Sequence, residues 1–306
     1  MLIEDLQVIL KVAEFKSITA AATHLDMRTA TASAAVKRVE KMLGTELFIR
    51  TTRQLRLSPA GERYLPECQQ ALNLLNQAEQ NAKGEQANIE GELRIAASSD
   101  LGRNLLVPWL DEFIELHPKI SVKVNISDSN IDFYRDAVDM ALRYGSPTDS
   151  NLYGFKICDV PGILCASPDY IAKHGQPSQP KDLAEHNGLF YQLYDIIHDI
   201  WQFDRDGQTT KIKIKGDRSA NDGDLVRRWC VAGKGVAVKS ALDIADDLLS
   251  DKLVQLLPEY QARQTELWLV CPSRQLITPA MRLLRDFLQE KCQSLQNQLE
   301  HKVKLT

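Results

Sequence analysis

The chain has 306 residues, of which 44% are hydrophobic and 25% charged, and its formal net charge is −4. This length allows two domains with large cores, and the composition is that of a water-soluble globular protein. No run of about 18 apolar residues is available to span a membrane, and the start, MLIEDLQVIL, carries acids where a signal peptide needs a basic flank. We therefore expect a cytoplasmic protein without membrane association.

The first 58 residues break into short helical segments. Apolar residues at helical spacing over residues 2–13 predict an amphipathic helix, and Ser17 is positioned to cap a second short helix, ITAAATHL. A tight turn at residues 26–28 leads into a third helix, about 29–43, which ends at Gly44 as helices often do. Consecutive alanines in the second helix permit the close approach that a sharp helix-turn-helix requires.

A hairpin is predicted next. After Gly44, the stretch TELFIRTTRQLRLS alternates apolar and polar residues, as two short antiparallel strands do. Between Arg28 and Arg56 there are seven bases and two acids, a net charge of about +5, which leaves about −9 for the rest of the chain. A local basic face on an acidic body is typical of a module that contacts DNA phosphates, although a solvated charged face would give the same count.

A long helix is predicted to follow the hairpin. Ser58 is a suitable N-cap, Pro59 suits the first helical position, and the pattern continues to about residue 84. Its apolar residues fall at a/d-like spacing: Leu65, Cys68, Leu72, Leu75 and Ala82. On a monomer we expect Leu65, Leu72 and Leu75 to form an exposed apolar stripe, so the pattern predicts pairing with a second subunit along this helix.

From Gly91 onward the sequence alternates between strand and helix patterns. The expected strands are ELRIAAS, SVKVNIS, DMALRY, GILCAS and ELWLVCP, and the expected helices include residues 105–116, 225–232 and 280–295. This order predicts an α/β domain with a largely parallel sheet. A single core and two subdomains with a cleft between them are both compatible with the length.

Cysteine and histidine usage gives no sign of a metal site. The six histidines and the six cysteines are scattered, without the C-x-x-C pairs of a zinc site or of a secreted disulfide framework. We expect reduced, mostly buried thiols, no metal and no cofactor. The cysteines are Cys68, Cys158, Cys165, Cys230, Cys271 and Cys292.

Several motifs in order resemble the LysR-type transcriptional regulators over nearly the whole chain. They are SITAAATHLDMRTATASAAVKRVEKMLGTELFIRTTRQLRLSPAGERYL, LVPWLDEFIELHP, DMALRYG, LCASPDYIAKHGQPSQPKDLAEH, AGKGVAV and LWLVCPS. The resemblance implies a sequence-specific DNA-binding regulator of transcription, modulated by a small-molecule effector, with double-stranded DNA as partner. It also implies a homodimer formed through the linker helix, and a homotetramer.

The resemblance implies three parts. Residues 1–58 would be a winged helix-turn-helix, residues 59–88 a linker and dimerisation helix, and residues 89–306 an effector-binding domain. That α/β domain resembles a two-lobed periplasmic binding protein, with lobe I over about 91–160 and 267–292 and lobe II over about 161–266. The effector would bind between the lobes.

The third helix would be the recognition helix. In the family it usually begins with serine-glutamine-proline and later carries serine-arginine, whereas this chain has RTA at residues 28–30 and SA at 33–34. The base contacts made by other members of the family therefore cannot be assigned directly to residues of this chain. Residues expected to face the DNA groove are Arg28, Thr29, Thr31 and Ser33, and those expected to contact phosphates are Lys37, Arg50, Arg53 and Arg56.

Strand ends and helix N-termini supply the expected effector site, because free backbone N–H groups there favour an anion. The residues are Ser98, Ser99, Asp100, Ser127, Asp128, Ser129 and Asn221. All are also ordinary N-cap types, which is the competing interpretation. Asp100 stands where the family often has serine, and its charge would repel an anion, so either it points away or the effector is cationic, neutral or polyhydroxylated.

An enzyme and a pure ligand-binding module are the function classes that compete with a DNA-binding regulator. An enzyme is disfavoured because the chain has no G-x-S-x-G elbow, no phosphate-binding glycine loop and no H-E-x-x-H motif. A pure ligand-binding module conflicts with the basic N-terminal segment. A DNA-binding regulator without any small-molecule effector stays open.

Overall fold

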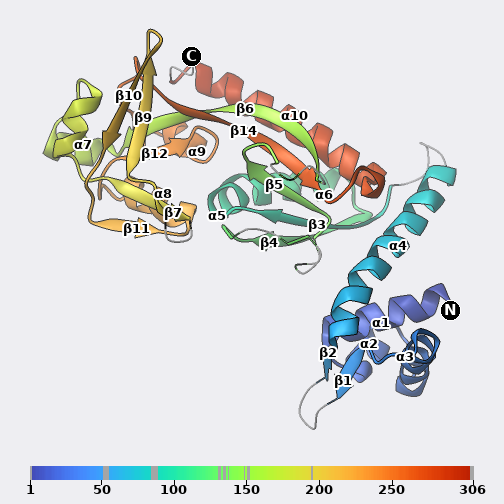
Figure 1. The fold of residues 1–306 in the computed structure, drawn as a ribbon. Coiled ribbons are helices and arrows are strands. Elements are labelled where there is room, and N and C mark those ends of the chain that lie inside the picture. The colour runs from blue at the N-terminus through green and yellow to red at the C-terminus, as the bar shows by residue number, and fades with distance from the viewer. Residues whose placement is uncertain are drawn as a thin grey trace. The chain divides into compact units, whose positions relative to one another are not determined.

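The computed structural model describes residues 2–50, 55–83, 89–129, 132–133, 136, 138–147, 149, 152–193 and 196–303. The chain divides into two compact units, Met1–Ala87 and Asn88–Thr306. Figure 1 shows the first unit in blue to cyan and the second in teal to red. Each unit is described by itself below.

The first unit is a winged helix-turn-helix followed by a long helix. Its elements are α1 (Ile3–Phe15), α2 (Ile18–His24), α3 (Thr29–Leu43), β1 (Phe48–Arg50), β2 (Leu55–Leu57) and α4 (Pro59–Lys83). The Ser17 hydroxyl accepts a hydrogen bond from the Ala20 N–H and so caps α2, as expected. Gly44 ends α3 with a φ of 68°, in the left-handed region that glycine adopts without strain. The predicted order of helices and hairpin is confirmed.

The core of the first unit includes the start of α4. Leu65, Cys68 and Leu72 are only 4–6% exposed and pack with residues of α1, α2 and α3. The expectation that Leu65 and Leu72 form an exposed stripe is therefore wrong, because this part of α4 lies against α1 of its own chain. Leu75, one turn beyond Leu72, is 49% exposed, while the side chain of Ala82 lies outside the described residues.

The junction between the wing and α4 requires a glycine. A Cβ atom on Gly61 would lie 2.2 Å from the carbonyl oxygen of Leu47, a distance that no real side chain tolerates. The Ser58 hydroxyl caps α4 by accepting from the Gly61 N–H, as expected, and donates to the carbonyl of Glu46 at 2.6 Å. The start of the helix is thus fixed to the residues just before β1.

The second unit alternates strands and helices. Its strands are β3 (Gly91–Ala97), β4 (Ile120–Ile126), β5 (Met140–Tyr144), β6 (Tyr153–Ala166), β7 (Leu189–Leu193), β8 (Ile196–Ile197), β9 (Ile200–Arg205), β10 (Gln208–Lys213), β11 (Arg218–Ala220), β12 (Ala237–Ser240), β13 (Val254–Gln255) and β14 (Gln261–Cys271). Its α-helices are α5 (Ser99–Leu101), α6 (Val107–Leu116), α7 (Pro168–His174), α8 (Gly223–Val231), α9 (Ala245–Leu249) and α10 (Pro279–Glu300), with a π-helical turn over Gly102–Leu106 and 3₁₀ turns over Pro180–Glu185 and Arg274–Leu276.

The sheets of this unit are mixed. β3 pairs in parallel with both β4 and β5, and β11 pairs in parallel with β7. Most of the other pairings are antiparallel, because the long strands β6 and β14 run against each other and take β5, β9, β12 and β13 as further neighbours. The expectation of a largely parallel sheet is therefore wrong. One antiparallel pair, β9 with β10, turns at Asp206 and Gly207, whose φ angles of 50° and 74° fit a tight hairpin.

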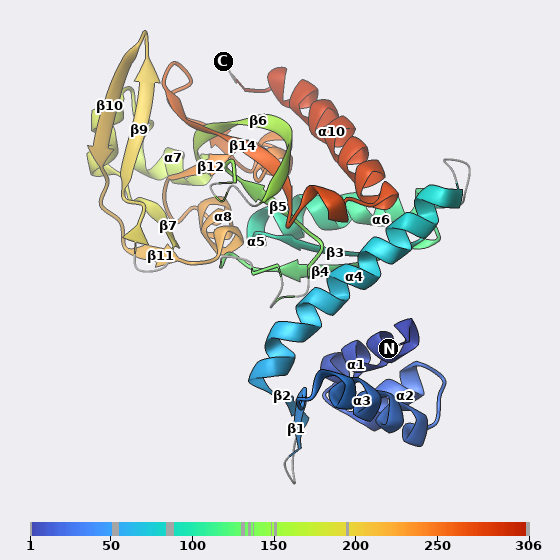
Figure 2. The ribbon, with the colours of Figure 1, turned by 45° about the vertical axis from the view of Figure 1, so that its right-hand side comes forward.

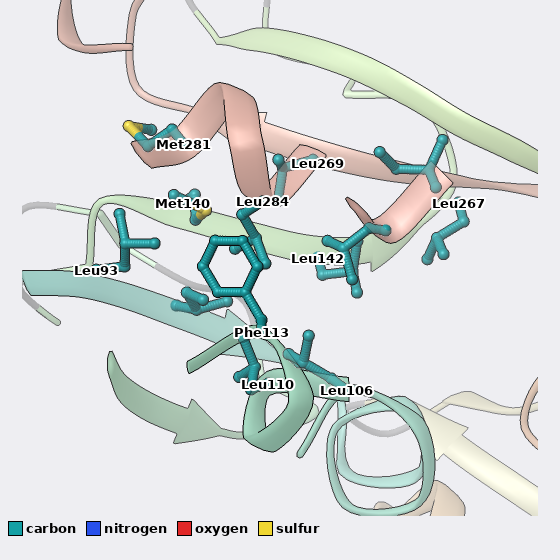
Figure 3. Packing of buried hydrophobic residues seen from close by; sticks show 14 of the residues in the cluster. Leu93, Leu106, Leu110, Phe113, Met140, Leu142, Leu267, Leu269, Met281 and Leu284 are labelled. Carbon is teal, nitrogen blue, oxygen red and sulfur yellow. The ribbon is translucent and has the colours of Figure 1, made fainter. Parts of the chain in front are cut away.

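The described part of this unit contains four clusters of buried side chains, which fall into two groups. Figure 3 shows the first, in which Phe113 of α6 lies among Leu110, Met140, Leu142 and Leu284. We call the part of the unit around this core lobe I. The second group, around β12, α8, α9 and the far half of β6, belongs to what we call lobe II.

Three elements take part in both lobes. In β6, Val160 packs in the lobe I core and Ile163 in lobe II. In β14, Ala262 packs in lobe II and Leu267 in the lobe I core. Figures 1 and 2 both show α10 running alongside β6, with its later residues packed in lobe II. The predicted residue limits of the lobes remain predictions, but the structure has two cores joined by these elements.

Candidate functional site

One face of α3 is exposed and carries the residues expected to meet DNA. Its buried residues, Ala32, Ala35, Val36 and Val39, repeat every three or four positions, so the opposite face is left to solvent. On that side Arg28, Thr29, Thr31 and Lys37 are exposed, and Ser33 is half-buried. The structure thus places five of the expected contacts on or beside one helix.

A partly buried ion pair fixes α3 to α1. The Arg38 guanidinium donates to both carboxylate oxygens of Asp5, at 3.2 and 2.5 Å, and the Asp5 side chain is only 5% exposed. Hydrogen bonding from Arg38 outweighs burial and lowers the pKa of Asp5. Arg38 was counted among the seven bases of the segment, but an acid outside that segment balances its charge.

The wing is held to the end of α3. The Glu40 carboxylate accepts hydrogen bonds from the backbone N–H groups of Leu47 and Phe48, at 2.9 and 3.2 Å. On β2, Arg56 is exposed and pairs across the hairpin with Ile49. Arg53 and the side chain of Arg50 lie outside the described residues.

The second candidate site lies where lobe I meets lobe II. The turn that follows β3 holds Ser98, Ser99 and Asp100, and the turn after the neighbouring parallel strand β4 holds residues 127–129, so both turns lie at the same edge of the sheet. The carboxylate of Asp128 accepts hydrogen bonds from the backbone N–H and the hydroxyl of Ser99, at 2.6 and 2.5 Å. The two expected turns are therefore in contact.

Other expected residues are placed less centrally. The hydroxyls of Ser127 and Ser129 bond to each other at 2.6 Å, and Ser129 is exposed. Ser98 stands at the N-cap position of the short helix α5 without a side-chain cap bond. Asn221 is exposed and is not the cap of α8, because Asp222 accepts from the Leu225 N–H at 2.9 Å.

Lobe I supplies hydrogen-bond acceptors to the first turn of α8 in lobe II. The N–H of Gly223 donates to Asp128 at 2.8 Å, and the N–H of Asp224 donates to the hydroxyl of Ser99 at 3.3 Å. A helix N-terminus has free N–H groups and a positive dipole end that favour negative charge. The chain's own carboxylate, from Asp128, takes that place at α8.

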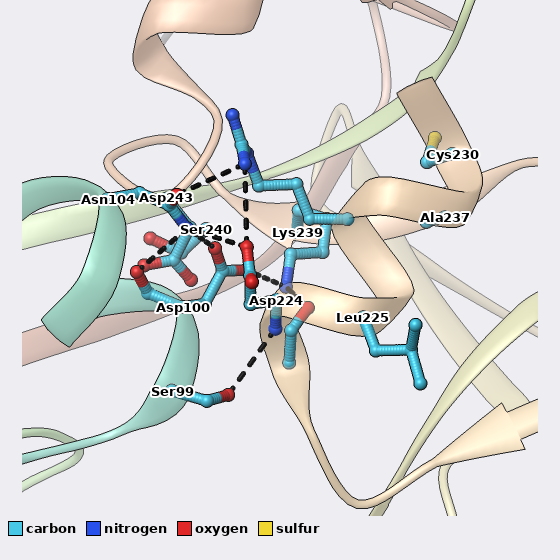
Figure 4. A network of polar contacts seen from close by, with 12 residues as sticks. Ser99, Asp100, Asn104, Asp224, Leu225, Cys230, Ala237, Lys239, Ser240 and Asp243 are labelled. Carbon is cyan, nitrogen blue, oxygen red and sulfur yellow. Dashed lines mark hydrogen bonds and ion pairs between the residues drawn. The ribbon is translucent and has the colours of Figure 1, made fainter. Parts of the chain in front are cut away.

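A buried ion pair also joins the lobes. Asp100 of α5 pairs with the ammonium group of Lys239 on β12, which also donates to the carbonyl of Gly223 at 3.0 Å. Both side chains are under 10% exposed, and burial raises the pKa of Asp100 despite the attraction of Lys239. Of the two alternatives expected for Asp100, the one in which its side chain points away is wrong: it points into the junction, where Lys239 offsets its charge. Figure 4 shows Ser99, Asp100 and Asn104 facing Asp224 and Lys239.

Further polar side chains surround this pair. The Asn104 amide donates to Asp100 at 2.8 Å and to Asp224 at 2.9 Å. The Tyr144 hydroxyl donates to Asp243 at 2.6 Å and accepts from Ser240 at 2.8 Å. Burial, together with the nearby charge of Asp100, raises the pKa of Asp243 to about 7.

Sequence reasoning did not select these surrounding residues. Lys239 follows directly on the AGKGVAV motif, which was noted for its resemblance, but nothing local marked it as the partner of Asp100. Asp222 and Asp224 flank the glycine that starts α8 and could have been noticed as acids at a helix N-terminus. Asn104 and Asp243 carry no local signal.

No helix in the part of the chain that the structure describes combines the length and apolar character needed to cross a bilayer. Among the same residues, no three or more His, Cys, Asp or Glu side chains gather in a way that could hold a metal ion.

Comparison with family models gives two matches. Residues 3–62 match the model described as "Bacterial regulatory helix-turn-helix protein, lysR family", and residues 86–293 match the model "LysR substrate binding domain". Together they span both units, from α1 to α10.

Known proteins resemble the chain over nearly its full length. It is 31% identical to the "HTH-type transcriptional regulator DmlR" of Escherichia coli, covering 94% of both chains, and 32% identical to the "HTH-type transcriptional regulator CrgA" of Neisseria meningitidis, covering 94% of this chain and 96% of CrgA. The solved structure of CrgA, "a LysR-type transcriptional regulator", matches with a TM-score of 0.58 over 95% of this chain and 98% of that one, at 30% identity. Full-length OxyR C199D of Pseudomonas aeruginosa, 16% identical with a TM-score of 0.65, shares the fold over 95% of this chain and 94% of its own.

Proposed function

The chain belongs to the LysR family of bacterial transcriptional regulators, and from this premise we propose how its residues divide DNA binding from effector sensing. Its relatives are DNA-binding regulators, and its second unit matches the family's substrate-binding domain. The chain is accordingly a DNA-binding transcriptional regulator with an effector domain. Which residues act, on which ligand and in which assembly, is our proposal.

We assign base recognition to the start of α3. Arg28, Thr29, Thr31 and Ser33 would reach base edges in the major groove, since the first turns of a recognition helix are the part that enters it. The exposure of Arg28, Thr29 and Thr31 at the start of the helix supports this assignment, and Ser33 is half-buried beside them.

Phosphate contacts would come from bases around that helix. We assign them to Lys37 on α3 and to the wing residues Arg50, Arg53 and Arg56. Phosphate contacts give affinity that falls steeply with salt, whereas base contacts give sequence preference. Arg38 is left out of this set because Asp5 already holds it.

Matched variants of the full chain test the DNA assignment. Replacing the exposed Arg56 by alanine is expected to weaken binding to all duplexes alike and to reduce the slope of log affinity against log salt by about one. Thr31→Ala is expected to change the preference among sequences with little change in that slope. Lys11→Ala removes a base on α1 that pairs with Glu14 and serves as the control. Fluorescence anisotropy with labelled duplexes measures all three, and an unchanged slope for Arg56→Ala would contradict the wing assignment.

The effector would bind at the junction of the two lobes. The proposed residues are Ser98, Ser99, Asp100, Ser127, Asp128, Ser129 and Asn221. Asp128 supports the placement, because its carboxylate joins the Ser99 turn of lobe I to the first turn of α8 in lobe II. An effector that changes the arrangement of the lobes has to replace or strengthen these bonds, since a ligand with equal affinity for both arrangements shifts no population.

The ion pair changes the expected chemistry of the effector. Because Lys239 offsets the charge of Asp100, an acidic effector is no longer disfavoured by Asp100 alone. We propose a small polar molecule that carries a carboxylate able to compete with Asp128 for the donors of Ser99 and Gly223.

The melting temperature of the full chain, measured with metabolites that the products of neighbouring genes act on, tests this site. The proposed site is supported if a ligand raises the melting temperature of wild type but not that of the double variant, which combines Ser99→Ala and Ser127→Ala. If the double variant responds as wild type does, the site is elsewhere. If no metabolite acts, the alternative of a regulator without an effector gains support.

The assembly and location are also proposed. We propose a homodimer paired along the exposed part of α4 around Leu75, with a tetramer as the larger assembly, and a cytoplasmic location where the chromosome is accessible. We assign the chain no catalytic activity, in line with relatives that are regulators.

A further inference from the structure

The base of the wing is held between two helices by the peptide groups of one residue, Leu47. The N–H of Leu47 donates to the side chain of Glu40 on α3 at 2.9 Å, and the Leu47 carbonyl accepts from the N–H of Ser58, which caps α4, at 2.9 Å. The Leu47 side chain is fully buried in the core of the first unit. A single residue just before β1 thus connects α3 with the start of α4.

The α3 side of this connection depends on one oxygen atom. Oε1 of Glu40 accepts hydrogen bonds from the backbone N–H groups of both Leu47 and Phe48, at 2.9 and 3.2 Å. Phe48 is the first residue of β1 and pairs with Leu57 of β2, so the two bonds fix the place where the hairpin begins. Hydrogen bonds set an orientation, whereas the apolar packing of Leu47 and Phe48 is non-directional.

The α4 side of the connection does not involve Glu40. The Ser58 hydroxyl donates to the carbonyl of Glu46 at 2.6 Å and accepts from the N–H of Gly61 at 3.0 Å. Figures 1 and 2 both show β2 leading directly into α4. Without the Glu40 side chain, the hairpin would therefore remain folded and joined to α4, but its place relative to α3 would be free to change.

We propose that Glu40 is a positioning residue for DNA binding, because it holds the wing at a fixed place beside α3. DNA phosphates repel a carboxylate, so Glu40 acts through the wing and does not contact the duplex. Phosphate contacts such as the one assigned to Arg56 require the cation to lie at a defined position on the DNA backbone. The role of Glu40 rests on this assignment, which belongs to the proposed function. It couples base reading by α3 to phosphate contact by the wing.

Charge and position predict opposite effects at residue 40. If only charge mattered, removing an acid close to the DNA would strengthen binding. If Glu40 positions the wing, Glu40→Ala weakens binding although the protein becomes less acidic. Glu40→Gln removes the same charge but keeps a side-chain oxygen that can accept from both N–H groups, so it separates the two effects. Glu46→Ala removes an exposed glutamate just before β1 and is the control for charge.

Fluorescence anisotropy with labelled duplexes measures these variants of the full chain, at a temperature where circular dichroism shows each of them to be folded. We expect Glu40→Ala to bind all duplexes on the order of tenfold more weakly, with an unchanged ranking of sequences and a slope of log affinity against log salt smaller by about one. Glu40→Gln and Glu46→Ala should bind as tightly as wild type or more tightly. The proposal is overturned if Glu40→Ala binds as tightly as Glu46→Ala, or if Glu40→Gln binds as weakly as Glu40→Ala.

A milder variant keeps the test decisive if Glu40→Ala is unfolded. Glu40→Asp retains the charge but withdraws the acceptor oxygens by one methylene group, whereas Glu40→Gln retains the acceptor and loses the charge. We expect Glu40→Asp to bind DNA more weakly than Glu40→Gln, because position decides the effect. The reverse order would show that charge decides it and would contradict the role of Glu40.

Double variants test whether the effect passes through the wing. Losses of affinity from two changes multiply when the sites are independent and fail to multiply when the sites act through a shared contact. Glu40→Ala with Arg56→Ala should lose about threefold less than the product of the single losses, because a wing without Arg56 has less to lose when it is misplaced. Glu40→Ala with Thr31→Ala, on α3, should give the full product.

The outcomes of these cycles separate the two proposals. Losses that multiply in both cycles would overturn the role of Glu40 in placing the wing. If Arg56→Ala alone binds as wild type does, the assignment of Arg56 under the proposed function fails. The positioning role is then decided by Glu40→Ala against Glu46→Ala: weaker binding of the first supports it, and equal binding refutes it.

Discussion

Asp128→Ala is the change expected to loosen the two lobes most directly. The Asp128 carboxylate accepts three hydrogen bonds, from the backbone N–H of Ser99, the Ser99 hydroxyl and the backbone N–H of Gly223, at 2.6, 2.5 and 2.8 Å. Alanine removes both acceptor oxygens, and with them all three hydrogen bonds, and leaves two backbone donors at the lobe junction. Ser99 is only 3% exposed, so its N–H cannot easily take water in exchange.

The expected magnitude follows from these bonds. A hydrogen bond to a charged group contributes roughly 1.5–3 kcal/mol, but Asp128 is half-buried and water can replace part of what is lost. We expect a net loss of about 2 kcal/mol in the free energy of unfolding of the second unit. For a unit of this size that corresponds to a fall in melting temperature of about 4–8 °C.

Tryptophan fluorescence measures this unit selectively. All four tryptophans of the chain, at positions 109, 201, 229 and 268, lie in the second unit, so a thermal scan of the full chain reports on it. Ser129→Ala, an exposed neighbour in the same turn, is the control and should change the melting temperature by no more than about 1 °C. A melting temperature for Asp128→Ala equal to that of the control would refute the argument that Asp128 joins the lobes.

Three further predictions concern α4, the wing and the buried acids. Leu72→Ala should lower the free energy of unfolding of the first unit by about 2–5 kcal/mol, measured by calorimetry, because the Leu72 side chain lies in the core. Leu75→Asp should instead change that free energy by no more than about 0.5 kcal/mol, and it should reduce the molar mass measured by light scattering. An unchanged assembly for Leu75→Asp would contradict pairing along α4. Gly61→Ala should destabilise the same unit by about 1–3 kcal/mol, since the added methyl group would clash with the carbonyl oxygen of Leu47. If circular dichroism gives this variant the same melting temperature as wild type, the residues before β1 are free to move away. Folding raises the pKa of Asp243 from its ordinary 3.8 to about 7, so between these values the folded protein holds a proton that the unfolded chain has released. The free energy of unfolding of the second unit should therefore fall as pH rises from 5 to 8, by at most about 1.4 kcal/mol per pH unit. Asp243→Asn should flatten this dependence on pH. A wild-type profile that rises with pH would show that other groups dominate.

Local signals in the sequence predicted the first unit well. The helix α3 was expected over residues 29–43 and is observed from Thr29 to Leu43, because helical periodicity and a following glycine act together within a short stretch. The cap at Ser58 was likewise predictable from residue types alone. The spacing of apolar residues on α4 showed that one face is covered, but not by which element, so Leu72 was wrongly expected to meet a second subunit.

Contacts between distant segments could not be predicted in the same way. Asp100 was selected as a departure from the family pattern, but its partner Lys239 lies on a strand far along the chain, and no local rule pairs the two. The contact between Asp128 and Gly223 likewise depends on how the lobes close over each other. The β9–β10 hairpin, in contrast, carried a usable signal in its Asp206-Gly207 turn that the strand pattern alone did not reveal.

We propose that the start of α3 reads DNA sequence while the basic residues around it bind the backbone. Footprinting of the full chain on the DNA upstream of its own gene tests it most directly, with wild type, Thr31→Ala and Arg56→Ala compared at two salt concentrations. We expect a discrete protected region for wild type, a changed pattern of protection for Thr31→Ala, and the same pattern at weaker, salt-sensitive affinity for Arg56→Ala. Identical footprints at identical affinities for all three proteins would contradict the claim.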